Sequence, residues 1–258
     1  MAAGERPTAT FRFYGDLNDF IAGAGPNMAS PLPEASTVKD AVEARGVPHV
    51  EIGLVLVDGE PAGFGHRLQG GERVAVYPRF AHGGLVPDGA VGPAGLDPAR
   101  FALDGHLGTL ARRMRLLGLD TWYRNEIDDA DLVSLAVAED RTVLTRDVDL
   151  LKRAALERGA WIRAIDPDQQ VLEVVDRFAV DAAIAPYTRC LRCNSSLRAA
   201  TAGEAAGAPE GAREDASDFT VCSDCDRLYW QGGHAASLDA MIDRVRAHRA
   251  RSATGRRG

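Results

Sequence analysis

The 258-residue sequence contains no long uninterrupted apolar run and only four cysteines. A membrane-spanning helix needs about 18 or more consecutive apolar residues, so we expect no such helix and no membrane partner. The first residues, MAAGERPTATFRFYG, also lack the apolar core that follows a basic start in a secretory signal. We therefore expect a cytoplasmic protein, long enough for one large domain or for two or three small domains with separate cores.

The sequence also has no excess of positive charge, and its formal net charge is −7. An acidic balance argues against a protein that binds nucleic acid over its whole surface. The exception is the basic C-terminal stretch DRVRAHRARSATGRRG. This stretch is either a contact for a polyanion or a solvated tail, and both interpretations fit its composition equally well.

Short strand and turn patterns fill the first segment, from about residue 8 to 84. ATFRFYG alternates as a strand does, and STVKDAVEARGV predicts a helix that is capped by Ser36 or Thr37 and ends at Gly46. EIGLVLVDGEPA predicts a strand that runs into an Asp-Gly hairpin turn, and LQGGERVAVYP predicts a closing strand. These elements together predict a small α+β roll.

Strand and helix patterns alternate from about residue 100 to 185, after a linker rich in Gly and Pro at 83–99. Strands are predicted in RFALDG, DTWYR, TVLT and WIRAI. Helices are predicted in HLGTLARRMRLLGL, DDADLVSLAVAEDR, DLLKRAALERG and PDQQVLEVVDRFAV. This order predicts a mostly parallel sheet with helices on its faces.

Four aspartates are predicted at the carboxyl-terminal edge of this sheet. Asp104 ends the first strand, Asp131 lies in the first turn of a helix, and Asp147 and Asp149 follow the strand TVLT. Clustered carboxylates repel one another unless a cation is present, and oxygen ligands of this kind favour Mg²⁺ or Mn²⁺. Such ions activate water and stabilise phosphodiester cleavage. Taken singly, each acid is more often a helix cap or a loop residue.

Two arginines are candidates for contacts with phosphate groups. Arg146 lies beside the predicted metal edge, where it either contacts a phosphate or pairs with an acid. Arg112 lies on the first helix of the second segment, where Arg113 and Arg115 are also predicted to fall largely off the apolar face. Such a set is more often a solvated helix face than an RNA groove.

The cysteines form two C-x-x-C pairs, Cys190/Cys193 and Cys222/Cys225, on either side of an Ala/Gly/Glu-rich insertion. Two such pairs predict a zinc ribbon in which four thiolates hold a structural Zn²⁺. Disulfides are disfavoured without a secretory signal, and a redox pair is disfavoured because neither motif opens a helix in a βαβ unit. His234 is predicted to be a surface or packing residue, since four cysteines complete the site.

Several motifs resemble known families. DLVSLAVAEDRTVLTRDVDL is similar to the PIN-domain nuclease pattern. FALDGHLGTLARRMRLLGLDTWY and VLTRD, with the trailing C-x-x-C-N and C-x-x-C-x-x-x-Y-W-x-G-x-H elements, resemble one branch, the Mut-seven C-terminal ribonuclease family. VDGEPA and LQGGERVAVYP resemble the sulfur-carrier branch of ubiquitin-like β-grasp domains. A ubiquitin-like domain is known to precede this ribonuclease domain.

The resemblance implies three domains: a ubiquitin-like β-grasp domain at 1–88, a PIN-like α/β ribonuclease domain at 100–186, and a zinc ribbon with a basic helix and tail at 187–258. It implies an enzyme that hydrolyses RNA with Mg²⁺ or Mn²⁺. The acids carried over are Asp104, Asp131, Asp147 and Asp149. The further acid that the PIN pattern places on an intervening helix has no counterpart here, so the number of metal ions stays open.

Two other functions fit parts of the sequence. One is a non-catalytic RNA-binding or adaptor protein that uses the zinc ribbon and the basic tail, with a protein partner for the β-grasp domain. The other is a sulfur-carrier role suggested by His82-Gly83-Gly84. That role is disfavoured because the chain continues far beyond Gly84, which leaves no terminal carboxylate to activate.

Overall fold

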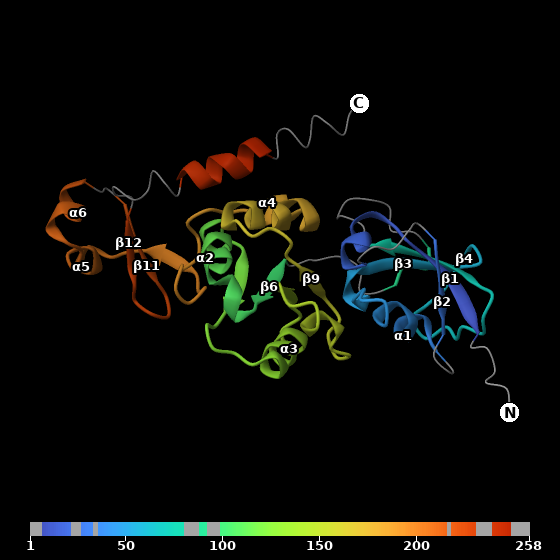
Figure 1. Ribbon diagram of the computed structural model, residues 1–258. Helices are drawn as coiled ribbons and strands as arrows, with labels where there is room; N and C mark the ends of the chain where they lie inside the picture. The colour runs from blue at the N-terminus through green and yellow to red at the C-terminus, as the bar shows by residue number, and fades with distance from the viewer. Residues whose placement is uncertain are drawn as a thin grey trace. The chain divides into compact units, whose positions relative to one another are not determined.

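The computed structural model describes most of the chain (Figure 1); its described residues are 7–21, 27–32, 36–79, 88–91, 99–215, 218–230 and 239–248. The chain divides into two compact units: residues 1–95 with 129–161, and residues 96–128 with 162–258. Within the described ranges, no helix is long and apolar enough to cross a bilayer. His82-Gly83-Gly84, His234 and most of the predicted linker lie outside the described residues.

The first unit contains the N-terminal strands and the middle of the second segment. Its strands are β1 (Thr8–Phe13), β2 (Met28–Pro31), β3 (Ile52–Val57), β4 (Glu60–Pro61), β5 (Arg73–Pro78), β8 (Thr142–Thr145) and β9 (Gly159–Trp161). Its helices are α1 (Val38–Glu43) and α3 (Asp129–Ala138), with 3-10 turns η1 (Gly15–Phe20), η2 (His49–Glu51) and η4 (Leu150–Lys152).

The second unit contains the remaining elements. Its strands are β6 (Arg100–Leu103), β7 (Asp120–Tyr123), β10 (Leu197–Ala199), β11 (Phe219–Cys222) and β12 (Leu228–Trp230). Its helices are α2 (Gly108–Leu116), α4 (Pro167–Phe178), α5 (Ala202–Ala205) and α6 (Glu210–Asp215), with 3-10 turns η3 (Gly105–Leu107) and η5 (Val180–Ala183). A further helix covers 239–248.

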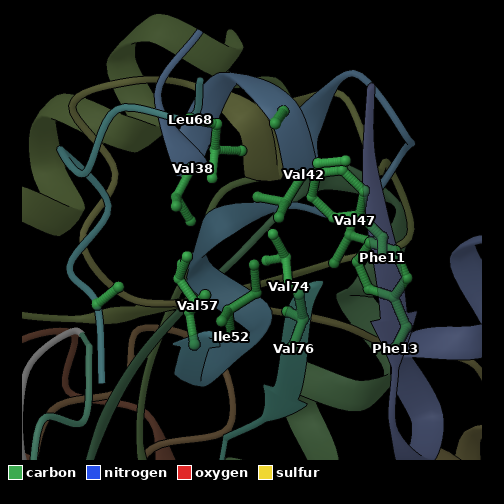
Figure 2. Packing of buried hydrophobic residues seen from close by; sticks show 14 of the residues in the cluster. Phe11, Phe13, Val38, Val42, Val47, Ile52, Val57, Leu68, Val74 and Val76 are labelled. Atoms are coloured by element: carbon green, nitrogen blue, oxygen red, sulfur yellow. The ribbon is translucent and has the colours of Figure 1, made fainter. Parts of the chain in front are cut away.

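The N-terminal sheet has the order β2-β1-β5-β3-β4, with β1 and β5 parallel and its other pairs antiparallel. The alternating strands and the apolar stripe of α1 bury one continuous core, because period-2 and period-3.6 patterns each direct apolar side chains to one face. Figure 2 shows this packing, and its labelled members are Phe11, Phe13, Val38, Val42, Val47, Ile52, Val57, Leu68, Val74 and Val76. The predicted α+β roll is confirmed.

Two short sequence signals account for the local geometry of this domain. Thr37 caps α1 through a reciprocal capping box with Asp40, in which each side chain binds the backbone N–H of the other residue. The β3–β4 turn has positive φ at both Asp58 (51°) and Gly59 (94°), as a two-residue type I′ hairpin turn requires. The helix cap and the hairpin are therefore where the sequence predicted them.

The second sheet has the order β7-β6-β8-β9. Its β6–β7 pair and its β8–β9 pair are both parallel, which confirms the predicted parallel sheet. A strand at the edge of a sheet has backbone groups without a neighbouring strand, and those groups need other partners. In this order the edge strands are β7 and β9.

The prediction of a helix in DLLKRAALERG is wrong. After the single 3-10 turn η4, the chain is irregular until β9 begins. Leu150, Leu151 and Leu156 are buried whereas Ala154 and Ala155 are exposed, so the buried positions do not repeat with a helical period. Two backbone carbonyls of this segment, those of Leu156 and Glu157, are instead bound by side chains of the β-grasp domain.

Three side chains of the β-grasp domain bind the segment 156–161. The carboxylate of Glu51, which is fully buried, accepts a hydrogen bond from the Trp161 N–H at 2.6 Å on β9. His49 Nε2 donates to the Leu156 carbonyl at 2.8 Å, and Arg79 Nη2 donates to the Glu157 carbonyl at 3.1 Å. Three backbone groups of this segment, in surroundings that range from buried to exposed, are therefore bound by side chains from a distant part of the sequence.

Removing the Glu51 carboxylate is expected to weaken this connection. Glu51→Ala removes the charged acceptor of the half-buried Trp161 N–H, and a hydrogen bond to a charged group contributes about 1.5–3 kcal/mol of stability. We expect faster amide hydrogen exchange at Trp161, whereas Glu51→Gln keeps an acceptor oxygen and preserves more of the protection. Glu60→Ala, at an exposed carboxylate of the same domain, is the control. Unchanged exchange at Trp161 in Glu51→Ala would show that this hydrogen bond does not hold β9.

Candidate functional site

Asp104 follows β6 and caps the 3-10 turn η3. Its side chain is largely buried, at 7% exposure, and its Oδ1 accepts a hydrogen bond from the His106 N–H at 2.8 Å. The turn is tight, because a Cβ on Gly105 would lie 2.6 Å from the Asn125 carbonyl oxygen. The hydroxyl of Tyr123, at the end of β7, lies 3.0 Å from the Gly105 carbonyl and donates to it. Asp104 is thus held in one position by packing on both sides of its turn.

Asp147 and Asp149 follow β8 and are connected by a hydrogen bond from the backbone of one to the side chain of the other. The Thr145 hydroxyl accepts from the Asp147 N–H at 2.9 Å, and Asp147 Oδ1 accepts from the Asp149 N–H at 2.8 Å. Both aspartates are exposed, and Asp149 pairs with Lys152 at 3.0 Å. The turn after β8 therefore presents two carboxylates to solvent.

Asp131 lies in the first turn of α3 and is exposed, while the buried stripe of this helix is Leu132, Val133 and Ala136. Among the described residues, the only group of three or more possible ligands with donor atoms within 4.8 Å of one another is the four cysteines. Asp131, Asp147 and Asp149 do not form a second group of this kind.

The four cysteine thiols form a compact cluster in the second unit. Cys190 and Cys225 Sγ atoms are 3.7 Å apart, and Cys193 and Cys222 Sγ atoms are 3.3 Å apart. A tetrahedral site with Zn–S bonds of about 2.3 Å separates its sulfurs by about 3.8 Å. A disulfide would bring two sulfurs to about 2.05 Å, and all four cysteines are free. The cluster therefore fits a tetrahedral metal ion, as the spacing of the cysteines predicted.

The environments of these thiols differ. Burial acts to raise the pKa of Cys190, but hydrogen bonds from the Tyr229 hydroxyl and from the backbone N–H groups of Cys193 and Arg192 outweigh it and lower this pKa to about 6. Burial raises the pKa of Cys222 to about 12 and also raises the pKa of Cys225. The Tyr229 hydroxyl lies 3.1 Å from Cys190 Sγ and accepts from the Leu191 N–H at 3.1 Å. This hydroxyl orients a metal ligand from outside the cluster.

The arginines of α2 differ from one another. Arg112 is exposed, as predicted, whereas Arg113 pairs with Asp168 at 2.9 Å. Arg115 is 4% exposed, so its predicted position off the apolar face is wrong. It lies four residues after the buried Ala111 and therefore on the same face of the helix. Arg146, the other predicted RNA contact, is exposed.

The described part of the basic C-terminal stretch is bound to α4. The helix at 239–248 places Arg244 2.8 Å from Asp168 and His248 2.7 Å from Asp176. Both side chains face protein carboxylates, and the pairing of Arg244 with Asp168 lowers the positive charge that this helix offers to a polyanion. Residues 249–258 lie outside the described part of the chain.

Comparisons with known proteins identify two regions. The family model described as "Mut7-C RNAse domain" matches residues 99–242, and the model described as "Mut7-C ubiquitin" matches residues 6–83. No curated protein matches the sequence.

Solved structures similar to part of the chain include two of the small archaeal modifier protein SAMP1 from Haloferax volcanii. They are 22% and 23% identical, cover 29% and 30% of this chain and 99% of theirs, and have TM-scores of 0.25 and 0.24. A third is a putative molybdopterin converting factor, subunit 1, from Pyrococcus furiosus, with 18% identity, 29% and 99% coverage and a TM-score of 0.24.

The first family match spans more than half of the 258 residues and contains the parallel strands, the four aspartates and the four cysteines. The second match spans the β-grasp sheet and its core. The chain therefore belongs to the Mut7-C RNAse domain family and has a Mut7-C ubiquitin domain in front of its RNAse domain.

Proposed function

We propose that this protein is a cytoplasmic ribonuclease that hydrolyses RNA phosphodiester bonds with Mg²⁺ or Mn²⁺. The observation that supports the proposal best is the position of acids after parallel strands of the matched RNAse domain: Asp104 follows β6, and Asp147 and Asp149 follow β8. Parallel strands of one sheet end at the same edge, which is where α/β proteins bind their ligands. Asp131, in the first turn of α3, is the fourth proposed ligand.

The proposed chemistry needs little from the protein beyond fixed oxygen ligands. When bound, Mg²⁺ or Mn²⁺ lowers the pKa of a water molecule and stabilises charge on the attacking and leaving oxygens. Asp104 supplies a ligand held by its own N-cap hydrogen bond, and the N–H of Asp149 orients the carboxylate of Asp147. Arg146 and Arg112, which are both exposed, are the proposed contacts for RNA phosphates.

We further propose that the four cysteines hold a structural Zn²⁺. Four thiolates occupy all four coordination positions of a tetrahedral zinc ion and leave none for water. Such a site stabilises the fold of its segment and does not catalyse a reaction. The β-grasp domain is the proposed site for a protein partner. A non-catalytic RNA-binding protein is the alternative function, and it makes a different prediction for variants of the acids.

Replacing Asp104 or Asp147 by Asn is expected to slow metal-dependent cleavage of RNA strongly. Losing one charged ligand worth about 3 kcal/mol in the transition state lowers the rate about a hundredfold. The measurement is cleavage of labelled RNA by purified full-length protein with Mg²⁺, Mn²⁺ or a chelator. Asp140→Asn is the matched control, because Asp140 is an exposed aspartate at the opposite end of β8. Cleavage that survives in Asp104→Asn and Asp147→Asn would rule out this site.

The same proteins separate the two candidate functions. A non-catalytic RNA-binding protein would bind RNA with a strong salt dependence, without divalent metal and with both acids replaced. Such binding with no cleavage by the unmodified protein would favour the alternative.

Zinc content is expected to be one ion per chain and to depend on every cysteine. Cys222→Ser removes a buried ligand, and we expect it to lose zinc and to destabilise β10–β12, because a structural zinc site contributes folding energy directly. Lowering the pH is expected to release zinc from the unmodified protein, because protons compete with the metal for the thiolates. Elemental analysis and thermal unfolding test both expectations. Ser223→Ala, between the ligands of the second pair, is the control.

A further inference from the structure

One residue of the first zinc knuckle, which we define as residues 190–194, binds the outer edge of strand β7. Asn194 Oδ1 accepts a hydrogen bond from the Thr121 N–H at 2.9 Å, and Asn194 Nδ2 donates to Asp120 Oδ1 at 2.8 Å. Thr121 is fully buried, so its N–H has no access to water. The Asn194 side chain therefore takes the place that another strand would have beside β7.

A buried arginine joins the same strand to the knuckle. Arg115 Nε donates to the Thr121 carbonyl at 2.9 Å, so both backbone polar groups of Thr121 are bound by side chains. Arg115 Nη1 donates to the carbonyls of Leu191 and Arg192, the two residues between Cys190 and Cys193, at 3.2 and 2.8 Å. Arg115 thus holds β7 and the knuckle at a fixed separation.

The knuckle must keep one conformation for Asn194 to reach β7. Asn194 has φ of 75°, its N–H donates to the Cys190 carbonyl at 3.0 Å, and its own carbonyl accepts from Arg189 Nη1 at 2.9 Å. A metal ion bound by Cys190 and Cys193 would fix the two ends of this turn. Metal binding and the position of the Asn194 side chain are therefore coupled.

The other end of β7 reaches the turn of Asp104. The hydroxyl of Tyr123, two residues after Thr121, donates a hydrogen bond to the Gly105 carbonyl. Gly105 directly follows Asp104. A Cβ on Gly108, the first residue of α2, would lie 2.6 Å from the Tyr123 hydroxyl oxygen, so the Tyr123 ring packs closely against this glycine. A displacement of β7 is thus transmitted to the turn that holds Asp104.

We propose that Asn194 is a positioning residue for the nuclease site: the zinc-bound knuckle fixes β7 through Asn194, and β7 fixes Asp104 through Tyr123. The inference rests on the proposed function in treating Asp104 as a ligand of the divalent cation and the cysteines as zinc ligands. The zinc site then has a role in the RNAse domain itself as well as in the ribbon.

The chain offers a matched pair of variants for the test. Asn194→Gly removes the side chain, and glycine adopts a φ of 75° without strain. Asp226→Gly is the control, because Asp226 occupies the equivalent position after the second C-x-x-C pair, has φ of 52° and is exposed. Both variants are compared with the unmodified full-length protein, zinc-loaded, with zinc content measured in each.

Amide hydrogen exchange is the primary measurement. The Thr121 amide reports on the Asn194 bond, the His106 amide reports on the Asp104 carboxylate, and the Val174 amide in α4 is the reference for general unfolding. We expect Asn194→Gly to speed exchange at Thr121 and His106 about tenfold, as for the loss of one hydrogen bond, with no change at Val174. Asp226→Gly should leave all three unchanged, and zinc removal from the unmodified protein should reproduce the effect of Asn194→Gly.

A second measurement separates this inference from the proposed nuclease function. Mn²⁺ binding is followed by electron paramagnetic resonance, and Asn194→Gly should weaken it while Asp226→Gly should not. Unchanged exchange at His106 in Asn194→Gly would overturn the inference even if Mn²⁺ binds normally. If the unmodified protein binds no Mn²⁺, the proposed metal site fails, whereas faster exchange at His106 in Asn194→Gly would still support the positioning of Asp104.

Discussion

The open backbone groups at the edges of a short parallel sheet are the constraint on which this structure depends. A strand at an edge must find partners for its N–H and C=O groups or leave them unsatisfied in the interior. At β9 the partner is the fully buried carboxylate of Glu51, and at β7 the partners are Asn194 and Arg115. Glu51 and Asn194 come from the flanking domains and Arg115 comes from α2, and each side chain supplies a hydrogen bond that a further strand would otherwise make.

These side chain-to-backbone hydrogen bonds connect the flanking domains to the RNAse domain. The β-grasp domain satisfies carbonyls of the segment that leads from the acids after β8 to β9, and the first knuckle satisfies the backbone of the strand beside Asp104. The β-grasp domain is therefore bound to the segment that follows Asp149, and the knuckle is bound to the strand beside Asp104. A domain that only recruited a partner or an RNA strand would not need buried polar contacts of this kind.

The sequence predicted most elements because their signals are local. The Asp-Gly turn, the capping box at Thr37 and the alternation of β1 all depend on residues within one turn or one strand. The aspartates after β6 and β8 could be placed in the same way, because each follows a short apolar run. The two C-x-x-C pairs predicted the cysteine cluster for the same reason.

The errors concern contacts between distant residues. DLLKRAALERG has helix-forming residues, but its carbonyls are bound by His49 and Arg79, which lie about 80 to 110 positions earlier. Arg115 is a charged residue on a buried face, and its partners are carbonyls of the ribbon. Asn194 was visible in the C-x-x-C-N motif, yet the motif does not indicate that its amide binds Thr121. Composition and periodicity carry no signal for such pairs.

The burial of Glu51 has a consequence for anyone who divides this protein into pieces. A fragment that began at the RNAse domain would lack that carboxylate, and the edge strand β9 would lose this hydrogen-bond partner and its cover. Uncovered strands of this type recruit a second chain by adding it edge to edge. Self-association of the truncated fragment would then reflect its missing neighbour and would say nothing about the oligomeric state of the whole protein.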